Sequence, residues 1–152
     1  MSVIDVCTLI GLLRVREENG AICECSLSGG RNDEHETPAP ILMEAKRQLE
    51  AYFSGERCSF DLPISMRGTA FETAVWTALC GIPHGCTKSY AQIAEEIGRP
   101  GAARAVGRAC GRNPLLVFVP CHRVIGANGA LTGFAAGIPA KKALLSLEKY
   151  HQ

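Results

Sequence analysis

Residues 115–125 read Leu-Leu-Val-Phe-Val-Pro-Cys-His-Arg-Val-Ile, and the rest of the chain is organised around them. The five leading apolar residues, mostly β-branched or aromatic, predict a short buried strand. Pro120 cannot donate a ladder hydrogen bond, so the strand should end there, directly before Cys121 and His122. A thiol beside an imidazole on a rigid element can form an activated nucleophile. A buried cysteine next to a solvated histidine is the alternative.

Length and composition indicate an ordinary globular protein. The 152 residues suit one average domain or two small ones, and 47% hydrophobic with 20% charged residues is enough for a real core. The formal net charge of +1 gives no overall basic excess. Any surface for nucleic acid must therefore come from the local placement of basic side chains.

The chain shows no sign of membrane insertion or export. No apolar run approaches the length of a membrane span. Residues 1–13 are fairly apolar, but Asp5 interrupts them and no basic region precedes them, so we expect no signal peptide. We therefore expect a cytoplasmic location without membrane contact.

Eight cysteines are scattered through segments that are predicted to form regular elements. Without a signal peptide, reduced thiols are a better interpretation than a disulfide framework. Zinc needs four ligands, typically from paired motifs, and the Cys23-x-Cys25 pair has no accompanying histidine pair. We expect neither a metal nor another cofactor.

The N-terminal half predicts a small sheet with one helix. Asn19-Gly20 lies between two apolar stretches and favours a hairpin turn, so residues 2–29 should form two or three antiparallel strands. Residues 29–40 are polar and predict a loop, and residues 41–53 have a helical period. Phe60 and Leu62 suggest a further strand. We expect this unit, residues 1–66, to act as a scaffold.

The C-terminal half is predicted to be helical. Thr69-x-x-Glu72 and Ser89-x-x-Gln92 have the capping-box pattern, so each predicts the start of a helix. A third helix should begin at Pro100 and run to about Cys110. The second and third helices together form a helix-turn-helix pattern, which generic bundles share.

The third helix is unusual in its small side chains. Only Val106 is a large apolar residue, while Arg104 and Arg108 project one turn apart. Small residues let a helix backbone approach another surface closely, and arginines contact phosphate. This composition favours binding to DNA, with tight helix–helix packing as the alternative.

The last helix should begin at Pro139 and place Glu148 on the same apolar face as Leu144. A buried carboxylate needs a partner, and His122 is a candidate. An exposed glutamate near a frayed helix end is the alternative.

The segment Pro120-Cys121-His122-Arg123-Val124 resembles the acceptor-site signature of the O6-alkylguanine-DNA alkyltransferases, also called methylated-DNA–protein-cysteine methyltransferases. The similarity extends from about residue 71 to residue 148. It includes Ser89-Tyr90, Ala103-Arg104-Ala105-Val106-Gly107 and Asn113-Pro114. The resemblance implies an α+β fold, in which a small antiparallel-sheet and helix domain (RNase H-like, residues 1–66) precedes a helical, winged-helix-like domain with a helix-turn-helix (residues 67–152).

The resemblance also implies direct DNA repair, one event per molecule. Cys121 would take the alkyl group from O6 of a flipped-out guanine, with O4-alkylthymine as a further substrate to consider, and the thioether would remain on the protein. A relay of Cys121, a water, His122 and Glu148 would remove the thiol proton. The substrate would be an O6-alkylguanine in double-stranded DNA, and the protein a monomer, cytoplasmic or associated with the nucleoid.

The resemblance assigns roles to further residues. Tyr90 donates to the flipped base, Asn113 braces the cysteine segment, and the carbonyl groups of Cys121 and Val124 accept from the exocyclic amine. Phe134 stands where the family usually has tyrosine, and Ala135 stands where it often has serine. The backbone N–H of Ala135 would face O6. These two differences leave the range of accepted substrates open. The third helix would enter the minor groove, with Arg104 in the base stack. Its DNA-contacting residues would be Ala103, Arg104, Ala105, Gly107 and Arg108.

Two other functions remain as alternatives. An alkyltransferase-like sensor binds lesions without transfer, but such proteins lack the acceptor cysteine that this chain has at position 121. A helix-turn-helix regulator would need a recognition helix rich in large basic side chains, and residues 101–110 are too small for reading the major groove.

Overall fold

The structure is a computed structural model that describes residues 2–28, 39–131 and 133–150. Its N-terminal half is a three-stranded antiparallel sheet of β1 (Ser2–Thr8), β2 (Gly11–Glu18) and β3 (Ala21–Leu27), in that order. Asn19 and Gly20 both have positive φ, as the predicted hairpin turn requires. Most of the predicted loop at 29–40 lies outside the described residues.

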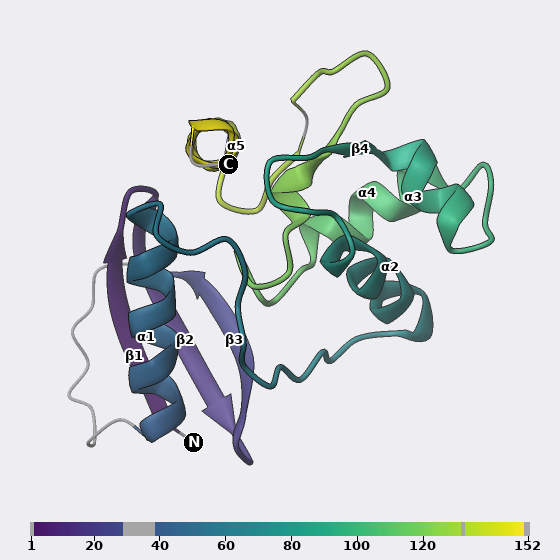
Figure 1. Cartoon of the computed structure of the whole chain (residues 1–152). Coiled ribbons are helices and arrows are strands. Elements are labelled where there is room, and N and C mark those ends of the chain that lie inside the picture. Colours follow the sequence, from purple (N-terminus) through teal and green to yellow (C-terminus); the bar gives the residue numbers. More distant parts are fainter. Residues whose placement is uncertain (1, 29–38, 132, 151–152) are drawn as a thin grey trace.

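Helix α1 (Pro40–Phe53) packs along one face of this sheet (Figure 1). The helical period predicted this helix to within one residue. Its buried face carries Leu42, Ala45, Leu49 and Tyr52. Tyr52, in the last turn, is therefore directed away from solvent near the end of the helix.

The second half contains α2 (Ala70–Cys80), α3 (Tyr90–Glu96), α4 (Ala103–Gly111) and α5 (Ile138–Tyr150). Both predicted capping boxes are present, with the side chains of Thr69 and Ser89 accepting from the backbone N–H three residues later. Trp76 of α2 donates its indole N–H to the carbonyl of Ala109, so α2 is hydrogen-bonded to the last turn of α4. The α+β prediction is confirmed.

The strand predicted at residues 115–119 is wrong. Leu115 forms an isolated bridge with Cys25, and the chain then turns, with Val117 at a φ of 71°. All five residues are buried. Their apolar character reflects burial on every side and not pairing in a sheet. Residues Cys121–Arg123 follow as a single 3₁₀ turn, η1, and Val124–Ile125 form β5, which pairs in parallel with β4 (Lys88–Ser89).

Two further predictions need correction. No strand includes Phe60 or Leu62; the nearby contact with the sheet is an isolated bridge between Ile22 and Ile64. Helix α4 begins at Ala103 and not at Pro100, because Gly101 has a φ of 90°, which no helix can include.

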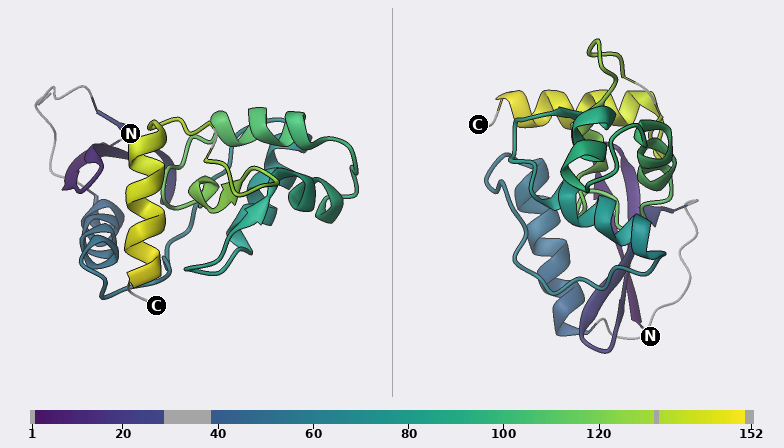
Figure 2. Two further views of the ribbon diagram at one scale, coloured as in Figure 1. Left: turned by 90° about the horizontal axis from the view of Figure 1, so that it is seen from above. Right: turned by 90° about the vertical axis from the view of Figure 1, so that its right-hand side faces the viewer.

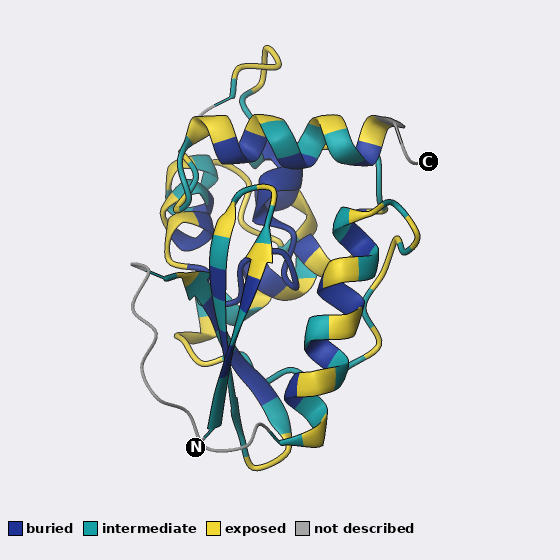
Figure 3. Cartoon of the chain, turned by 90° about the vertical axis from the view of Figure 1, so that its left-hand side faces the viewer, coloured by how far each residue is buried: buried dark blue, intermediate teal, exposed yellow. Residues whose placement is uncertain are grey.

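One buried apolar cluster extends through both halves of the chain. Helix α5 crosses one end of the molecule, with α1 and the remaining helices on its inner side (Figure 2), and its inner face is buried like that of α1 (Figure 3). The largest fully buried apolar side chains include Trp76, Tyr52, Leu13, Ile22, Leu42, Leu49, Leu79, Ile82, Ile93, Leu115 and Leu144. Among the described helices, none is both long and apolar enough to cross a membrane.

Candidate functional site

Cys121 is the first residue of η1 and is only 2% exposed. The amide of Asn113 donates to its Sγ at 3.2 Å and to the carbonyl of Val119 at 2.8 Å. The Oδ1 of the same amide accepts from the N–H of Leu115 at 2.9 Å. This one side chain therefore adds to the backbone hydrogen bonds of the buried turn and helps to fix the position of the thiol.

The thiol of Cys121 is protonated at neutral pH. Burial raises its pKa to about 11, against the opposing effects of the Asn113 hydrogen bond and the positive charge of Lys141. Because the thiolate is the nucleophilic form, this cysteine needs a base nearby.

His122 has the geometry of such a base. Its Nε2 lies 2.7 Å from Oε2 of Glu148, and both side chains are buried. The pKa of Glu148 is lowered, so the carboxylate accepts and Nε2 must carry the hydrogen. Nδ1 then holds a free lone pair, and it has no hydrogen-bond partner among the described residues. Burial lowers the pKa of His122, which keeps the ring neutral and able to accept a proton at Nδ1.

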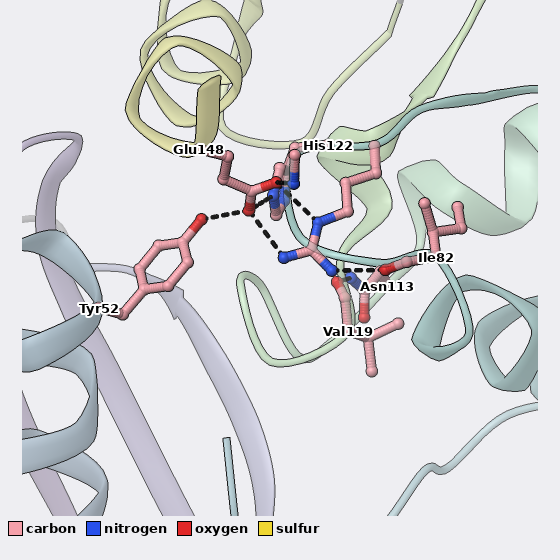
Figure 4. Close-up of polar contacts among 8 residues, drawn as sticks. Tyr52, Ile82, Asn113, Val119, His122 and Glu148 are labelled. Atoms are coloured by element: carbon pink, nitrogen blue, oxygen red, sulfur yellow. Dashed lines mark hydrogen bonds and ion pairs between the residues drawn. The ribbon is translucent and has the colours of Figure 1, made fainter. Parts of the chain in front are cut away.

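Glu148 is held by donors from three parts of the fold, and Figure 4 shows those from α1 and η1. Arg123 donates from Nε to Oε1 and from Nη2 to Oε2, both at 2.8 Å. The hydroxyl of Tyr52 donates to Oε2 at 2.5 Å, and the N–H of Gly85 to Oε1 at 3.3 Å. Burial by itself would raise the pKa of Glu148, but the hydrogen bonds from His122, Arg123 and Tyr52 outweigh it and lower the pKa.

The sequence predicts Glu148 and its partner His122, whereas Arg123 and Tyr52 were not predicted as partners of the carboxylate. Arg123 follows His122 directly and could have been considered as a second partner for the carboxylate. Tyr52 gave no such signal, because its place on the apolar face of α1 is that of an ordinary core residue.

Lys141 was also missed. Its side chain is fully buried, and Nζ donates to the carbonyl of Val124 at 2.5 Å and to the hydroxyl of Tyr90 at 3.5 Å. Burial lowers the pKa of its ammonium group. The helical spacing that placed Glu148 inward with Leu144 also places Lys141 on that face, so the signal was present.

The remaining candidate residues gather on one side of this cluster. A pocket of about 480 Å³ is lined by Tyr90, Ala103, Arg104, Gly107, Arg108 and Gly133. A Cβ added at Gly107 would lie 3.8 Å from the Tyr90 ring, which is an ordinary van der Waals contact, so α4 passes close to this ring. Arg104 and Arg108 are exposed, whereas Ala105 is partly covered.

Phe134 and Ala135 lie on the long loop before α5. The Phe134 ring is 6.4 Å from the ring of His122, in an edge arrangement, and Ala135 is exposed. Within the described parts of the chain, no group of three or more histidine, cysteine or acidic side chains could hold a metal ion.

Comparison with known proteins gives a consistent result over both halves. Residues 70–150 match the family model described as 6-O-methylguanine DNA methyltransferase, DNA binding domain. Residues 8–66 match the model described as 6-O-methylguanine DNA methyltransferase, ribonuclease-like domain.

Individual relatives agree with these matches. A methylated-DNA–protein-cysteine methyltransferase of Mycobacterium tuberculosis is 57% identical over 116 residues, which cover 76% of this chain and 70% of that protein. The constitutive methylated-DNA–protein-cysteine methyltransferase of Bacillus subtilis is 48% identical over 93% of this chain and 92% of its own. A crystal structure of Mycobacterium tuberculosis OGT in complex with DNA matches with a TM-score of 0.86 and 47% identity, covering 98% of this chain and 92% of that one.

Proposed function

This chain belongs to the 6-O-methylguanine DNA methyltransferase family, and we propose that its Cys121 takes the alkyl group directly from damaged DNA. The observation that carries this assignment is the buried Cys121 thiol in one turn with a neutral His122 whose Nε2 is bonded to the Glu148 carboxylate. A protonated thiol beside a base with a free lone pair is an arrangement that can generate a thiolate when a substrate is present.

We propose the following reaction on O6-alkylguanine. The thiol proton of Cys121 passes through a water to Nδ1 of His122, and the ionised Glu148 stabilises the imidazolium that forms. The thiolate attacks the alkyl carbon, so that a carbon–sulfur bond forms while the bond from that carbon to O6 breaks. The guanine leaves as an anion with the electron pair, and the Tyr90 hydroxyl donates a hydrogen bond to it. The proton taken up by His122 then returns through water to the released base, so that both end neutral.

The flipped base would be held by the residues around the 480 Å³ pocket. Tyr90 lines it. The carbonyls of Cys121 and Val124 would accept from the exocyclic amine. The Val124 carbonyl accepts from Lys141 Nζ, and a carbonyl oxygen has two lone pairs with which to accept. Phe134 would stack on the base and the N–H of Ala135 would face O6.

The transfer should occur once per molecule. A thioether sulfur is a poor leaving group, so removal of the alkyl group would need a second nucleophile. Cys110 is buried on α4, and burial raises its pKa to about 12 and keeps it protonated, so it cannot act as that nucleophile. With methylated DNA in excess, we therefore expect no more than one lesion repaired per chain. Sustained turnover by the protein alone would rule out this mechanism.

We also propose that the protein binds double-stranded DNA through α4, as a monomer, with the helix in the minor groove. The support is local, because the formal net charge is only +1 while Arg104 and Arg108 are exposed on a helix of small residues. Residues 67–152 would form the DNA-binding and acceptor unit, and residues 1–66 its scaffold. A protein with this activity would work in the cytoplasm or on the nucleoid.

The two arginines of α4 should have different effects. Arg104→Ala should slow repair of a lesion in duplex DNA far more than reaction with free O6-benzylguanine, because filling the gap of a flipped base offsets an unstacking cost of a few kcal/mol. Arg108→Ala should weaken binding to any duplex and reduce the slope of log K against log salt by about 1, as loss of one phosphate contact does. Single-turnover rates and salt titrations measure these effects. Equal losses of Arg104→Ala activity on duplex and free base would assign Arg104 to the pocket or the fold.

A further inference from the structure

Tyr52 connects the N-terminal half to the candidate relay. It is 1% exposed in the last turn of α1, and its hydroxyl reaches Oε2 of Glu148 across 96 positions of sequence, at 2.5 Å (Figure 4). Its ring is surrounded by Phe53, Phe60 and His84, with centroid distances of 5.1, 5.4 and 6.1 Å. The hydroxyl is therefore held in place by packing of the ring.

The oxygen that Tyr52 contacts is the one that holds His122. Oε2 of Glu148 receives Tyr52 at 2.5 Å, His122 at 2.7 Å and Arg123 Nη2 at 2.8 Å. A carboxylate has about four lone-pair sites over both oxygens, so three donors on one oxygen compete with each other. A hydrogen bond from the Tyr52 hydroxyl to Oε2 therefore weakens the hydrogen bond that His122 makes to the same oxygen.

We propose that Tyr52 is a positioning residue of the proton relay, whose hydroxyl shares Glu148 Oε2 with His122 and so limits how firmly that imidazole holds a proton. The inference rests on the proposed function, in which His122 accepts the thiol proton of Cys121. It gives the N-terminal half a direct part in the chemistry, in addition to its role as a scaffold.

The charged and titratable groups around His122 determine how its pKa responds to the loss of the Tyr52 hydroxyl. Glu148 raises the pKa of His122, whereas Arg123 and Lys141 lower it. Burial and then the charge of Glu148 raise the pKa of Tyr52, so its hydroxyl stays neutral and its removal changes no charge. The charged or titratable groups around His122 come from several elements. Helix α5 contributes Glu148 and Lys141, η1 contributes Arg123 and Cys121, and α1 contributes Tyr52. Further out, Cys80 of α2 faces Arg123, and His84 faces Tyr52.

The test is Tyr52→Phe, which keeps the ring and its packing and removes the hydroxyl. Without that donor, Glu148 should bind the imidazolium more strongly and raise the pKa of His122 by about 0.5 unit. NMR titration of the histidine rings in the DNA-free protein measures this, with His122→Asn identifying the signal among four histidines. The acid limb of the single-turnover rate against pH should move upward by the same amount.

Two controls separate hydrogen bonding from packing. Leu49→Val lies on the same buried face of α1, about one turn earlier, and should lower stability without moving the His122 titration. In a Glu148→Gln background, Tyr52→Phe should have no effect on that titration. A shift in Leu49→Val equal to that in Tyr52→Phe would overturn the inference.

The inference and the proposed function can fail separately. An unchanged His122 titration in Tyr52→Phe overturns the role of Tyr52, whether or not the protein transfers alkyl groups. A wild-type protein that never transfers a methyl group overturns the proposed function, while a shifted titration would still support the shared hydrogen bond.

Discussion

Cys121→Ser is expected to bind methylated duplex DNA as tightly as the wild type and to transfer no detectable methyl group. The substitution keeps the shape of the side chain, and α4 with its two exposed arginines is untouched. A hydroxyl is far less acidic than a thiol, and even the Cys121 thiol has its pKa raised to about 11 by burial. A buried serine in this position would have no anionic form with which to attack.

Methyl transfer from labelled duplex and a gel-shift titration measure the two halves of this prediction. Cys86→Ser is the matched control, because Cys86 is an exposed free thiol, and it should transfer normally. Full activity in Cys121→Ser would mean that another residue accepts the alkyl group.

Glu148→Gln should lower the single-turnover rate by about 100-fold or more, within the range expected for loss of general-base assistance. A neutral amide cannot stabilise the imidazolium of His122, and it leaves the buried guanidinium of Arg123 without its ion pair. Affinity for undamaged DNA should stay nearly the same, because Glu148 is buried on α5 and does not belong to α4. Glu50→Gln, an exposed acid on α1, should leave the rate unchanged. An unaltered rate in Glu148→Gln would assign the carboxylate to the fold alone.

The same variant should be less stable, with a defined pH dependence. Removing one partner of a buried ion pair costs about 3–5 kcal/mol. The folded pKa of Glu148 lies below its unfolded value of about 4.3, so its contribution is complete above that pH and is lost as the pH falls toward the folded pKa. The difference in unfolding free energy between the wild type and the variant should therefore shrink below about pH 4.3, as measured by urea titrations.

Local patterns predicted the elements that local interactions determine. The capping boxes at Thr69 and Ser89 and the turn at Asn19 and Gly20 each depend on residues within four positions, and each is present as predicted. The strand at 115–119 failed because an apolar run reports burial, whereas strand formation also needs a partner along its whole length. Here a single bridge to Cys25, turn hydrogen bonds within residues 115–121 and the Asn113 side chain take the place of a strand ladder.

The residues of the candidate site also differ in whether a local sequence pattern could predict them. Helical spacing placed Glu148 inward, but the same spacing at Lys141 was not used, because a lysine is usually solvated. Tyr52 could not be found from any local pattern, since its contact with Glu148 joins α1 to α5 and exists only in the folded chain. The acceptor motif therefore predicts the nucleophile Cys121 and its base His122. The groups that contact Glu148 and change the pKa values of the site, such as Tyr52, are brought there only by the fold.

The central claim is that Cys121 itself becomes alkylated, and mass spectrometry tests it most directly. After incubation with duplex DNA containing O6-methylguanine, the intact chain should gain the mass of one methyl group. Peptide mapping should locate that group on Cys121, with the other seven cysteines unmodified. A chain that binds the lesion and gains no mass would instead be a lesion sensor, and a methyl group on another residue would contradict the account given for Cys121, His122 and Glu148.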